Sequence, residues 1–403
     1  MGNTLIYFIS HPLVPPPDPL QAALPSLHLS SFLAAIFSTT KAEYLRSTPS
    51  TTFLLPHNEA FKSLGLLVSA HLLAPSSKDD LENVIYHHAI DTVQYAQAFV
   101  NGSQHSFSTL ESTDVNVDRL KNGTVLISSS GGWADLAAEL IPRDLLTQTG
   151  VIHELSDILI PRSVSLSIGK LVKAAQANTM ATLLTKAGFE WVLNGTAPPE
   201  DSPWFDLANG VPGWTLLCPP DDAFKKVNLT QLYADTERVK SIVTQHLIPM
   251  PDTKPAFAGR DTIRRWYNNL PLVLDDATYS TIRSADSAFG DLAFQKVKET
   301  GEFIVGIRGA RGTDAQDDWA RVTAWGRTTT GGGSGGVIQI DRLLEPYEPS
   351  LLRLLGPPLT VGLLGMIGIV GFFYGVRRLW LRDTMEATYE PVGGFGRDDD
   401  DDI

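Results

Sequence analysis

Two stretches of the chain carry the same apolar stripe, with the spacing of one helix face. Apolar residues stand at i, i+3 and i+4 of each stretch, and a histidine follows at i+7. The two sets are Leu81, Val84, Ile85 and His88, and, 158 residues later, Val239, Ile242, Val243 and His246. Ser77 and Asp235 precede them at the same interval and predict N-caps, because their side-chain oxygens can accept from first-turn N–H groups. The pattern predicts two equivalent amphipathic helices.

Two further pairs of segments repeat in the same order along the chain. Residues 51–61 (TTFLLPHNEAF) match residues 214–224 (WTLLCPPDDAF). Each predicts a short apolar strand ended by a proline, then Asn58 or Asp221 capping a helix that buries Ala-Phe. Residues 150–161 (GVIHELSDILIP) and 336–346 (GVIQIDRLLEP) predict strands that close each unit. Three matched segments indicate a duplicated domain.

The segments between these repeats are mostly β in pattern. Asn122-Gly123 predicts a hairpin turn, and Thr300-Gly301 precedes a strand at residues 303–307. Residues 167–188 predict one further helix that stops at its final glycine. Polar segments rich in proline and glycine are expected to form loops, at residues 194–213, 249–261 and 309–318. The predicted class is α+β.

A long apolar stretch lies close to the end of the chain. Residues 359–376 contain no charge, and the stretch extends back to residue 354, interrupted only by Gly356, Pro357 and Pro358. As a helix it would measure about 27 to 35 Å, against about 30 Å for the hydrocarbon core of a bilayer. Because it is apolar on every face, it predicts a transmembrane helix at 354–376 rather than a buried core helix.

Arginines indicate which way this helix would cross the membrane. Arg377, Arg378 and Arg382 follow the stretch closely, whereas only Arg342 and Arg353 lie just before it. Basic residues concentrate on the cytoplasmic side of membrane spans. We therefore expect residues 377–403 to form a cytoplasmic tail of a single-pass membrane protein.

Four N-glycosylation sequons agree with this orientation. They begin at Asn101, Asn122, Asn194 and Asn228, all on the N-terminal side of the stretch. That side would then face the exterior or the lumen, and the protein would be a glycoprotein.

The first 23 residues have no clear signal peptide. They contain a short apolar run at residues 5–9 but no basic segment before it. Two explanations stay open: an incomplete or atypical start, or a tail-anchored protein with its bulk in the cytosol. The second would leave the sequons unused and place three arginines on the wrong side, so the first is favoured.

Composition and charge narrow the classes of partner. The 403 residues, 43% hydrophobic and 19% charged, are too many for one ordinary domain and too apolar for a disordered chain. The formal net charge of −13 disfavours a nucleic-acid partner, which leaves membranes and proteins. A single cysteine excludes an intrachain disulfide and a cysteine-based zinc cluster.

The repeated segments resemble the three signature regions of fasciclin-type domains, over about residues 24–346. The resemblance implies two tandem fasciclin-like domains of membrane-anchored, fungal type, each a β-sandwich wedge with packed helices. We expect an N-terminal segment at 1–23, domain 1 at 24–163 and domain 2 at 164–347. Such domains mediate adhesion or matrix contact outside the cytosol. The family commonly has a tyrosine before the histidine, where this chain has His87 and Gln245, with Tyr86 displaced by one residue.

The histidines and the cysteine are predicted to be structural. His88 and His246 close apolar faces, which favours hydrogen-bonded core positions, and His87 points to a different helix face. No spacing in the chain supports a metal site, so we expect neither metal nor cofactor. Cys218 follows an apolar run without a local histidine, which favours a buried side chain over a nucleophile.

Two other patterns resemble catalytic motifs but are better explained as loops or helix caps. Residues 331–336 (GGGSGG) contain a G-x-S-x-G motif around Ser334 and a G-x-G-x-x-G motif, but a strand pattern follows where both motifs need a helix. Pairs of adjacent aspartates are predicted to cap helices or to lie in solvated loops, because sequence neighbours seldom face each other. They are Asp79-Asp80, Asp221-Asp222, Asp275-Asp276 and Asp317-Asp318.

The tail contains a short sorting-type pattern. Tyr389, Glu390, Pro391 and Val392 resemble the tyrosine-based signals that adaptor complexes bind, and an acidic run follows at residues 398–402. An adaptor at the tail would direct the protein to endosomes or a vacuole.

These observations predict a non-catalytic cell-adhesion or interaction protein, with protein or glycan ligands at the cell surface or in the lumen. The alternative is a vacuolar or endosomal membrane protein that assists docking, fusion or trafficking. A hydrolase acting through Ser334 is the third hypothesis. No convergent acid, base and nucleophile set supports catalysis.

Overall fold

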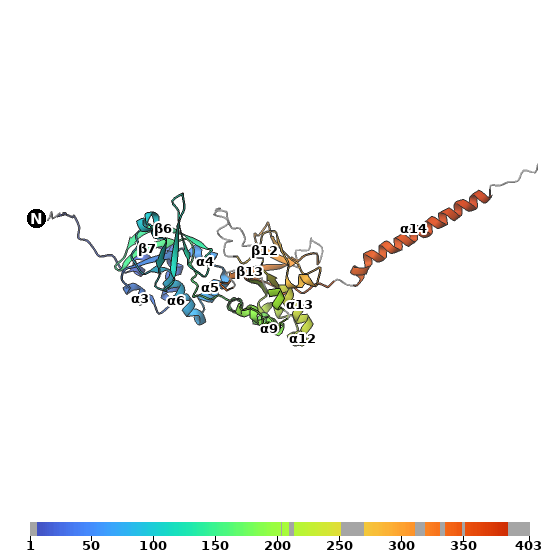
Figure 1. Cartoon of the computed structure of the whole chain (residues 1–403), viewed down its shortest axis with the longest axis horizontal. Coiled ribbons are helices and arrows are strands. Elements are labelled where there is room, and N and C mark those ends of the chain that lie inside the picture. Colours follow the sequence, from blue (N-terminus) through green and yellow to red (C-terminus); the bar gives the residue numbers. More distant parts are fainter. Residues whose placement is uncertain are drawn as a thin grey trace, which may run out of the picture. The chain divides into compact units, whose positions relative to one another are not determined.

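The computed structural model describes residues 6–202, 204–208, 213–250, 270–310, 319–330, 335–348 and 351–385. Contacts divide the chain into two compact units, Met1–Pro346 and Tyr347–Ile403. The first unit holds two strand-rich repeats, and the second holds the long helix α14 (Leu351–Met385) (Figure 1).

The first repeat contains a seven-stranded sheet in the order β2-β1-β7-β6-β5-β4-β3. Its strands are β1 (Thr51–Pro56), β2 (Ala89–Ile90), β3 (Ser106–Ser108), β4 (Asp114–Arg119), β5 (Val125–Ser129), β6 (Ala137–Leu146) and β7 (Gly150–Leu155). Its helices are α1 (Pro19–Ala23), α2 (Ser30–Phe37), α3 (Ala42–Ser47), α4 (Asn58–Ser63), α5 (Leu66–Leu72), α6 (Lys78–His87) and α7 (Ala96–Asn101), with 3-10 turns η1 (Leu27–Leu29) and η2 (Pro75–Ser77).

The first sheet is barrel-like because its two end strands approach each other. β1 and β7 run parallel, and the other neighbouring strands run antiparallel. A bridge joins Ile90 in β2 to Thr109 just after β3, and Leu110 N–H donates to the Ala89 carbonyl at 2.8 Å. These contacts cover backbone groups that an open edge would leave unpaired.

The second repeat contains a seven-stranded sheet in the order β10-β11-β12-β13-β14-β8-β9. Its strands are β8 (Trp214–Cys218), β9 (Leu247–Pro249), β10 (Ala277–Tyr279), β11 (Leu292–Lys296), β12 (Phe303–Ile307), β13 (Ala320–Arg327) and β14 (Gly335–Ile340). Its helices are α8 (Ile168–Ala174), α9 (Asn178–Lys186), α10 (Glu190–Asn194), α11 (Phe205–Ala208), α12 (Leu229–Ala234) and α13 (Thr236–His246), with 3-10 turns η3 (Asp221–Phe224) and η5 (Ile282–Ala285).

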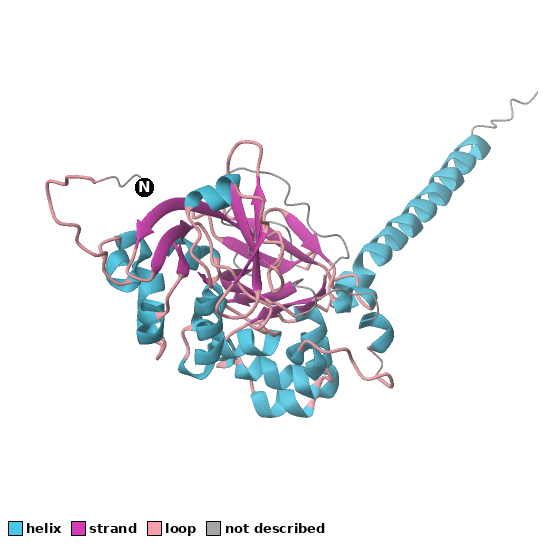
Figure 2. Ribbon diagram, turned by 60° about the vertical axis from the view of Figure 1, so that its left-hand side comes forward, coloured by secondary structure: helices cyan, strands magenta, loops and turns pink. Residues whose placement is uncertain are grey.

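The predicted duplication is confirmed by the matching positions of three elements. The segments of the repeated sequence become β1 and β8, α6 and α13, and β7 and β14. In both repeats the first and last of these pair as parallel strands inside an otherwise antiparallel sheet. The α+β class is also confirmed, with most helices of the first unit gathered on one side of the strands (Figure 2).

The structure corrects the alignment of the closing strands by one residue. Thr51 pairs with Gly150, and its equivalent Trp214 pairs with Gly335, not with Gly336. A Cβ atom at Gly150 would collide with the Thr51 carbonyl, and one at Gly335 with the Trp214 carbonyl. Both strands must therefore begin at a residue without a side chain, and the repeat offset is 185 rather than 186 residues.

The predicted helix at residues 167–188 is wrong, because two helices occupy this segment. Ser167 caps α8, and its Oγ accepts from Lys170 N–H at 3.3 Å. The chain then turns at Gln176, whose φ of 54° lies in the left-handed region, and α9 begins at Asn178. The apolar stripe continues across the break, so periodicity alone did not reveal it.

The hairpin turn predicted at Asn122-Gly123 and the strand predicted after Thr300-Gly301 are confirmed. Gly123 joins β4 to β5 with a φ of 85°, and its N–H donates to the Leu120 carbonyl at 2.9 Å. Gly301 joins β11 to β12 with a φ of 74°, and β12 has the predicted bounds. Glycine suits both positions because a positive φ strains other residues.

The largest hydrophobic core spans the helices of both repeats, and each sheet encloses a smaller one. The large core includes Leu55, Val84 and Leu171 as well as Val243 and Val337. One smaller core lies in each sheet, around Val117 in the first and around Phe294 in the second. The two repeats therefore share buried apolar side chains.

Polar contacts also join the repeats. Trp133 donates from Nε1 to the Thr328 carbonyl at 3.0 Å in a buried position. Leu166 N–H donates to Thr329 Oγ1 at 2.7 Å, and Thr329 N–H donates to the Leu166 carbonyl at 3.0 Å. The segment between β7 and α8 is thus held against the end of β13.

Helix α14 contains a candidate membrane span. Residues Val361–Leu381 are long and apolar enough to cross a membrane by length and composition, and none of this span is buried within the structure. It overlaps the predicted span at 354–376 and ends five residues later. The predicted boundaries of the domains, the helix and the tail remain predictions.

Candidate functional site

The closing histidines of α6 and α13 make the same two hydrogen bonds. His88 donates from Nδ1 to the Val84 carbonyl at 2.7 Å, and its Nε2 accepts from Leu159 N–H at 3.1 Å. His246 donates from Nδ1 to Ile242 at 2.8 Å and accepts from Leu344 N–H at 3.3 Å. An Nε2 that accepts carries no proton, so both rings are neutral. Leu159 and Leu344 are 185 residues apart, which agrees with the corrected offset.

These histidines join a helix end to the segment after the closing strand. Both are buried, and burial lowers the pKa of each to about 4. A neutral imidazole that is hydrogen-bonded to two backbone groups has a structural role in the core. The apolar stripe that contains each histidine predicts this role. Neither ring is placed to act as a general base or a ligand.

The residues before these histidines are buried polar anchors. His87 bonds from Nε2 to Ser129 Oγ at 2.9 Å and from Nδ1 to Thr113 Oγ1 at 2.8 Å. Burial lowers the pKa of His87 to about 3. Gln245, in the equivalent position, donates from Nε2 to the Gly290 carbonyl at 2.9 Å. The position where the resemblance implies a tyrosine thus contacts β5 in the first repeat and the segment just before β11 in the second.

The caps predicted at Asn58 and Asp221 are real but belong to other helices. Asn58 is the first residue of α4, and its Oδ1 accepts from Ser31 N–H in α2 at 2.8 Å. Asp221 Oδ1 accepts from Thr179 N–H in α9 at 2.7 Å. The predicted capping of the following helix is therefore wrong, because each side chain lies against the N-terminus of a helix brought there by tertiary packing.

The two predicted caps at Ser77 and Asp235 differ in outcome. Asp235 accepts from Arg238 N–H at 3.0 Å and caps α13. Ser77 precedes α6 but makes no capping bond, because its Oγ bonds to His71 Nδ1 at 3.1 Å. Only the second repeat has the predicted cap.

Asp80 forms an ion pair between the repeats instead of a solvated cap. His71 Nε2 and Lys170 Nζ each lie 2.8 Å from Asp80 Oδ2. Burial raises the pKa of Asp80, but the hydrogen bonds from His71 and Lys170 outweigh it and hold the pKa below its ordinary value. Sequence position alone did not indicate these partners.

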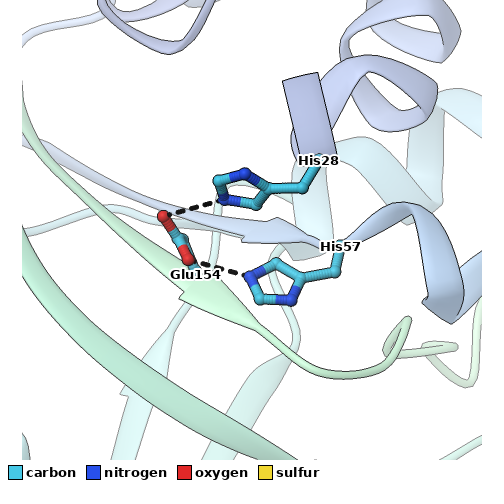
Figure 3. Close-up of side chains that lie close together, drawn as sticks. All are labelled: His28, His57 and Glu154. Carbon is cyan, nitrogen blue, oxygen red and sulfur yellow. Dashed lines mark hydrogen bonds and ion pairs between the residues drawn. The ribbon is translucent and has the colours of Figure 1, made fainter. Parts of the chain in front are cut away.

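A further cluster, His28, His57 and Glu154, was not singled out by any sequence pattern (Figure 3). His28 Nε2 lies 3.2 Å from Glu154 Oε1, and His57 Nε2 lies 2.8 Å from Glu154 Oε2. Arg143 Nε is 3.2 Å from the same Oε1. Burial raises the pKa of Glu154, but hydrogen bonds from both histidines and the charge of Arg143 outweigh it, and the pKa is lowered.

The cluster is built from three distant segments. His28 lies in η1, His57 immediately precedes α4, and Glu154 lies in β7. Intervals of 29 and 97 residues match no metal-binding motif. Only the pairing of β1 with β7 and the docking of η1 bring the three together.

The predicted glycosylation sites lie on the surface. Asn101, Asn122, Asn194 and Asn228 are all exposed, at two helix ends, a hairpin turn and a helix N-cap. The sorting-signal residues Tyr389 and Val392 lie outside the described residues.

Ser334 and Cys218 are the two candidate nucleophiles, and the structure describes only Cys218. Ser334 lies outside the described residues, and strand β14 begins directly after it, so the motif lacks its required helix. Cys218 is buried in β8, and burial raises the pKa of its thiol. A buried protonated thiol is a poor nucleophile.

The fasciclin domain family model matches residues 27–161 and 175–274, which is more than half of the chain. The chain therefore belongs to the fasciclin domain family, and its two repeats are fasciclin repeats.

Curated relatives share this family. Human periostin is 26% identical over 225 residues, which cover 55% of this chain and 22% of periostin. The pig transforming growth factor-beta-induced protein ig-h3 is 22% identical over 241 residues, covering 56% of this chain and 31% of that protein. The chain thus spans about a fifth to a third of the length of these relatives. A solved FAS1 domain pair from the insect cell adhesion molecule Fasciclin I is 16% identical, with a TM-score of 0.29, and covers 79% of this chain and 96% of that one.

Proposed function

We propose that this protein is a non-catalytic adhesion or interaction protein that displays two fasciclin repeats from a single membrane-spanning helix. The observation that carries the proposal is the family match across both repeats, together with the candidate span Val361–Leu381 in the described part of the chain. The ligands would be proteins or glycans at the cell surface or in a lumen.

The contacts of the titratable side chains support a role without catalysis. In the described part of the chain, His88, His246 and His87 are buried and bonded to the protein's own groups. Cys218 is buried, and Asp80 is paired with His71 and Lys170. Side chains held in this way stabilise the fold and leave no positioned acid, base and nucleophile among them.

The proposed topology places both repeats outside the cytosol and the C-terminus inside it. Arg377 and Arg378 lie within the last five residues of the candidate span Val361–Leu381, and Arg382 directly follows it, at the end that would be cytoplasmic. The four sequon asparagines are exposed on the opposite side of the span in sequence, where a glycosyltransferase could reach them.

Glycosidase treatment combined with protease protection tests this topology. We expect the full chain in intact membranes to resist external protease on the cytosolic side and to gain mobility after N-glycosidase. A variant with Asn→Gln at positions 101, 122, 194 and 228 is the matched control and should show no mobility change. An unshifted wild-type chain that is digested from the cytosolic side would contradict the proposal.

A cell-aggregation assay tests the adhesive role. Labelled cells that express the full chain are mixed with unlabelled cells that do or do not express it. Clusters of expressing cells alone would indicate homophilic contact, and mixed clusters would indicate a ligand on the other cell. If neither aggregates beyond untransfected cells, nor binds extracellular matrix, the adhesion proposal fails.

The alternative of an endosomal or vacuolar protein rests on the tail pattern around Tyr389 and Val392. An adaptor complex would bind this segment in extended form through the tyrosine and the apolar residue. We expect Tyr389→Ala to redistribute a tagged chain to the cell surface, whereas Glu390→Ala, at an interior position, should not. An unchanged distribution of Tyr389→Ala would remove this signal.

A further inference from the structure

We propose that His28, His57 and Glu154 in the first fasciclin repeat bind a divalent transition metal ion of the zinc type. One ligand atom from each side chain lies within 4.8 Å of the other two (Figure 3). Two imidazole nitrogens and a carboxylate are a donor set that suits zinc, and it leaves a fourth position for water or a partner.

The distances between donors require little rearrangement. The two imidazole nitrogens already lie 3.2 and 2.8 Å from the oxygens of Glu154. Ligands of a tetrahedral zinc ion bound at about 2.0–2.2 Å are separated by roughly 3.3 Å. Small side-chain rotations would therefore place all three donors around one ion.

The backbone around the cluster is held by the contacts of the repeat. His57 N–H donates to the Leu155 carbonyl at 2.9 Å, which fixes the end of β1 beside β7. Asn58 Nδ2 donates to the Leu27 carbonyl at 3.0 Å, which positions η1 and therefore His28. Such a preformed arrangement lowers the ordering entropy that binding has to overcome.

The cluster is open to solvent on one side. The side chain of Glu154 is 9% exposed, whereas that of His28 is 49% exposed. An ion can therefore enter past His28 and meet the carboxylate at the base of the cluster.

Arg143 already pairs with the carboxylate that would bind the ion. Its Nε lies 3.2 Å from Glu154 Oε1, and its side chain is 54% exposed, so it can leave towards water. A metal ion and the guanidinium would compete for one carboxylate. This competition predicts that removing Arg143 strengthens metal binding. If the cluster were purely structural, the same change would only remove one contact to Glu154.

The second repeat provides an internal comparison. His57 precedes Asn58, and its equivalent is Pro220, which precedes Asp221. Glu154 pairs with Leu55 in the first sheet, and its equivalent is Gln339, which pairs with Cys218 in the second. Gln176 stands three residues before the capped Thr179 amide, as His28 stands before Ser31. The second repeat thus has the same frame without a metal-binding donor set.

Calorimetry with zinc chloride tests the proposal on the full chain in lipid nanodiscs, purified without a histidine tag. We expect one site that prefers zinc over magnesium. His28→Ala, at a half-exposed position, and Glu154→Gln, the residue of the second repeat, should each weaken binding at least about tenfold. Arg143→Ala should tighten it several-fold, and His11→Ala, at an exposed histidine outside the cluster, should leave it unchanged.

A second measurement separates loss of the site from loss of the fold. Thermal unfolding with and without zinc should show a rise in melting temperature for the wild type and none for His28→Ala. The proposal is overturned if zinc does not bind, if binding survives both His28→Ala and Glu154→Gln, or if magnesium binds as well as zinc.

Discussion

At the residue scale, the buried histidines act as neutral connectors. His88 and His246 each join a helix carbonyl to a backbone amide beyond the closing strand, and this requires an unprotonated Nε2. Protonation would turn the acceptor into a donor facing another N–H. The fold is therefore tied to the charge state of these rings.

This linkage predicts that stability falls as the pH is lowered from about 6.5 to about 4. Burial lowers the pKa of His88 and His246 to about 4 and of His87 to about 3, whereas unfolded histidines titrate near 6.5. The unfolded chain therefore binds more protons in this range, and each pH step downwards favours it.

Urea denaturation at pH 7.5, 6.0 and 5.0 measures the effect. The midpoint should decrease at each step. Asp80, Asp221 and Glu154 have lowered pKa values, so their contribution is lost only at still lower pH. A midpoint that is constant between pH 7.5 and 5.0 would contradict the connector role.

The close backbone approach at Gly150 gives a second prediction at this scale. Gly150→Ala should lower the free energy of unfolding by about 2 kcal/mol or more, because its Cβ would meet the Thr51 carbonyl. Gly123→Ala is the control, since its Cβ would meet nothing within 4 Å and only its φ of 85° is unfavourable. Chemical denaturation should show the larger loss for Gly150→Ala; equal losses would refute the argument.

At the element scale, each repeat uses one side chain to fasten two helices. Asn58 and Asp221 begin one helical segment and cap another, α2 or α9, through a backbone N–H near its start. Because an uncapped N-terminus leaves amides unsatisfied, these contacts stabilise the docking of the helix as well as its end.

Asp221→Ala should therefore destabilise the protein by about 1–2 kcal/mol. Its neighbour provides the control: the Asp222 side chain is 81% exposed and pairs with exposed Lys225, so Asp222→Ala should change stability by less than about 0.5 kcal/mol. Thermal denaturation followed by circular dichroism distinguishes the two variants. Similar melting temperatures for both would count against the cap.

At the scale of the whole molecule, the two repeats are joined through a buried contact. Trp133 donates to the Thr328 carbonyl, Arg327 lies 5.8 Å from the Trp133 ring, and Lys170 pairs with Asp80. A Cβ at Gly326 would be only 3.0 Å from Leu67 Cβ, so the strand approaches α5 closely. Shared buried surface predicts that the repeats unfold together.

Calorimetry of Trp133→Ala tests this coupling. We expect one unfolding transition for the wild type and two separate transitions, or one broadened transition, for the variant. Trp133→Phe keeps most of the ring but removes the N–H donor, so it should have an intermediate effect. Two transitions already present in the wild type would show that the contact does not couple the repeats.

The sequence by itself determined the duplication, the α+β class, the hairpin at Gly123 and the apolar helix near the C-terminus. The duplication follows from three matched segments in the same order. The others follow from periodicity or turn chemistry within single elements, which side-chain spacing records directly. Only the tertiary structure decided that Asn58 caps α2, that the helix breaks at Gln176 and that His28, His57 and Glu154 meet. The Asn58 cap and the His28–His57–Glu154 cluster join segments up to 126 residues apart, from His28 to Glu154. Strand register and helix docking, not local pattern, bring such segments together.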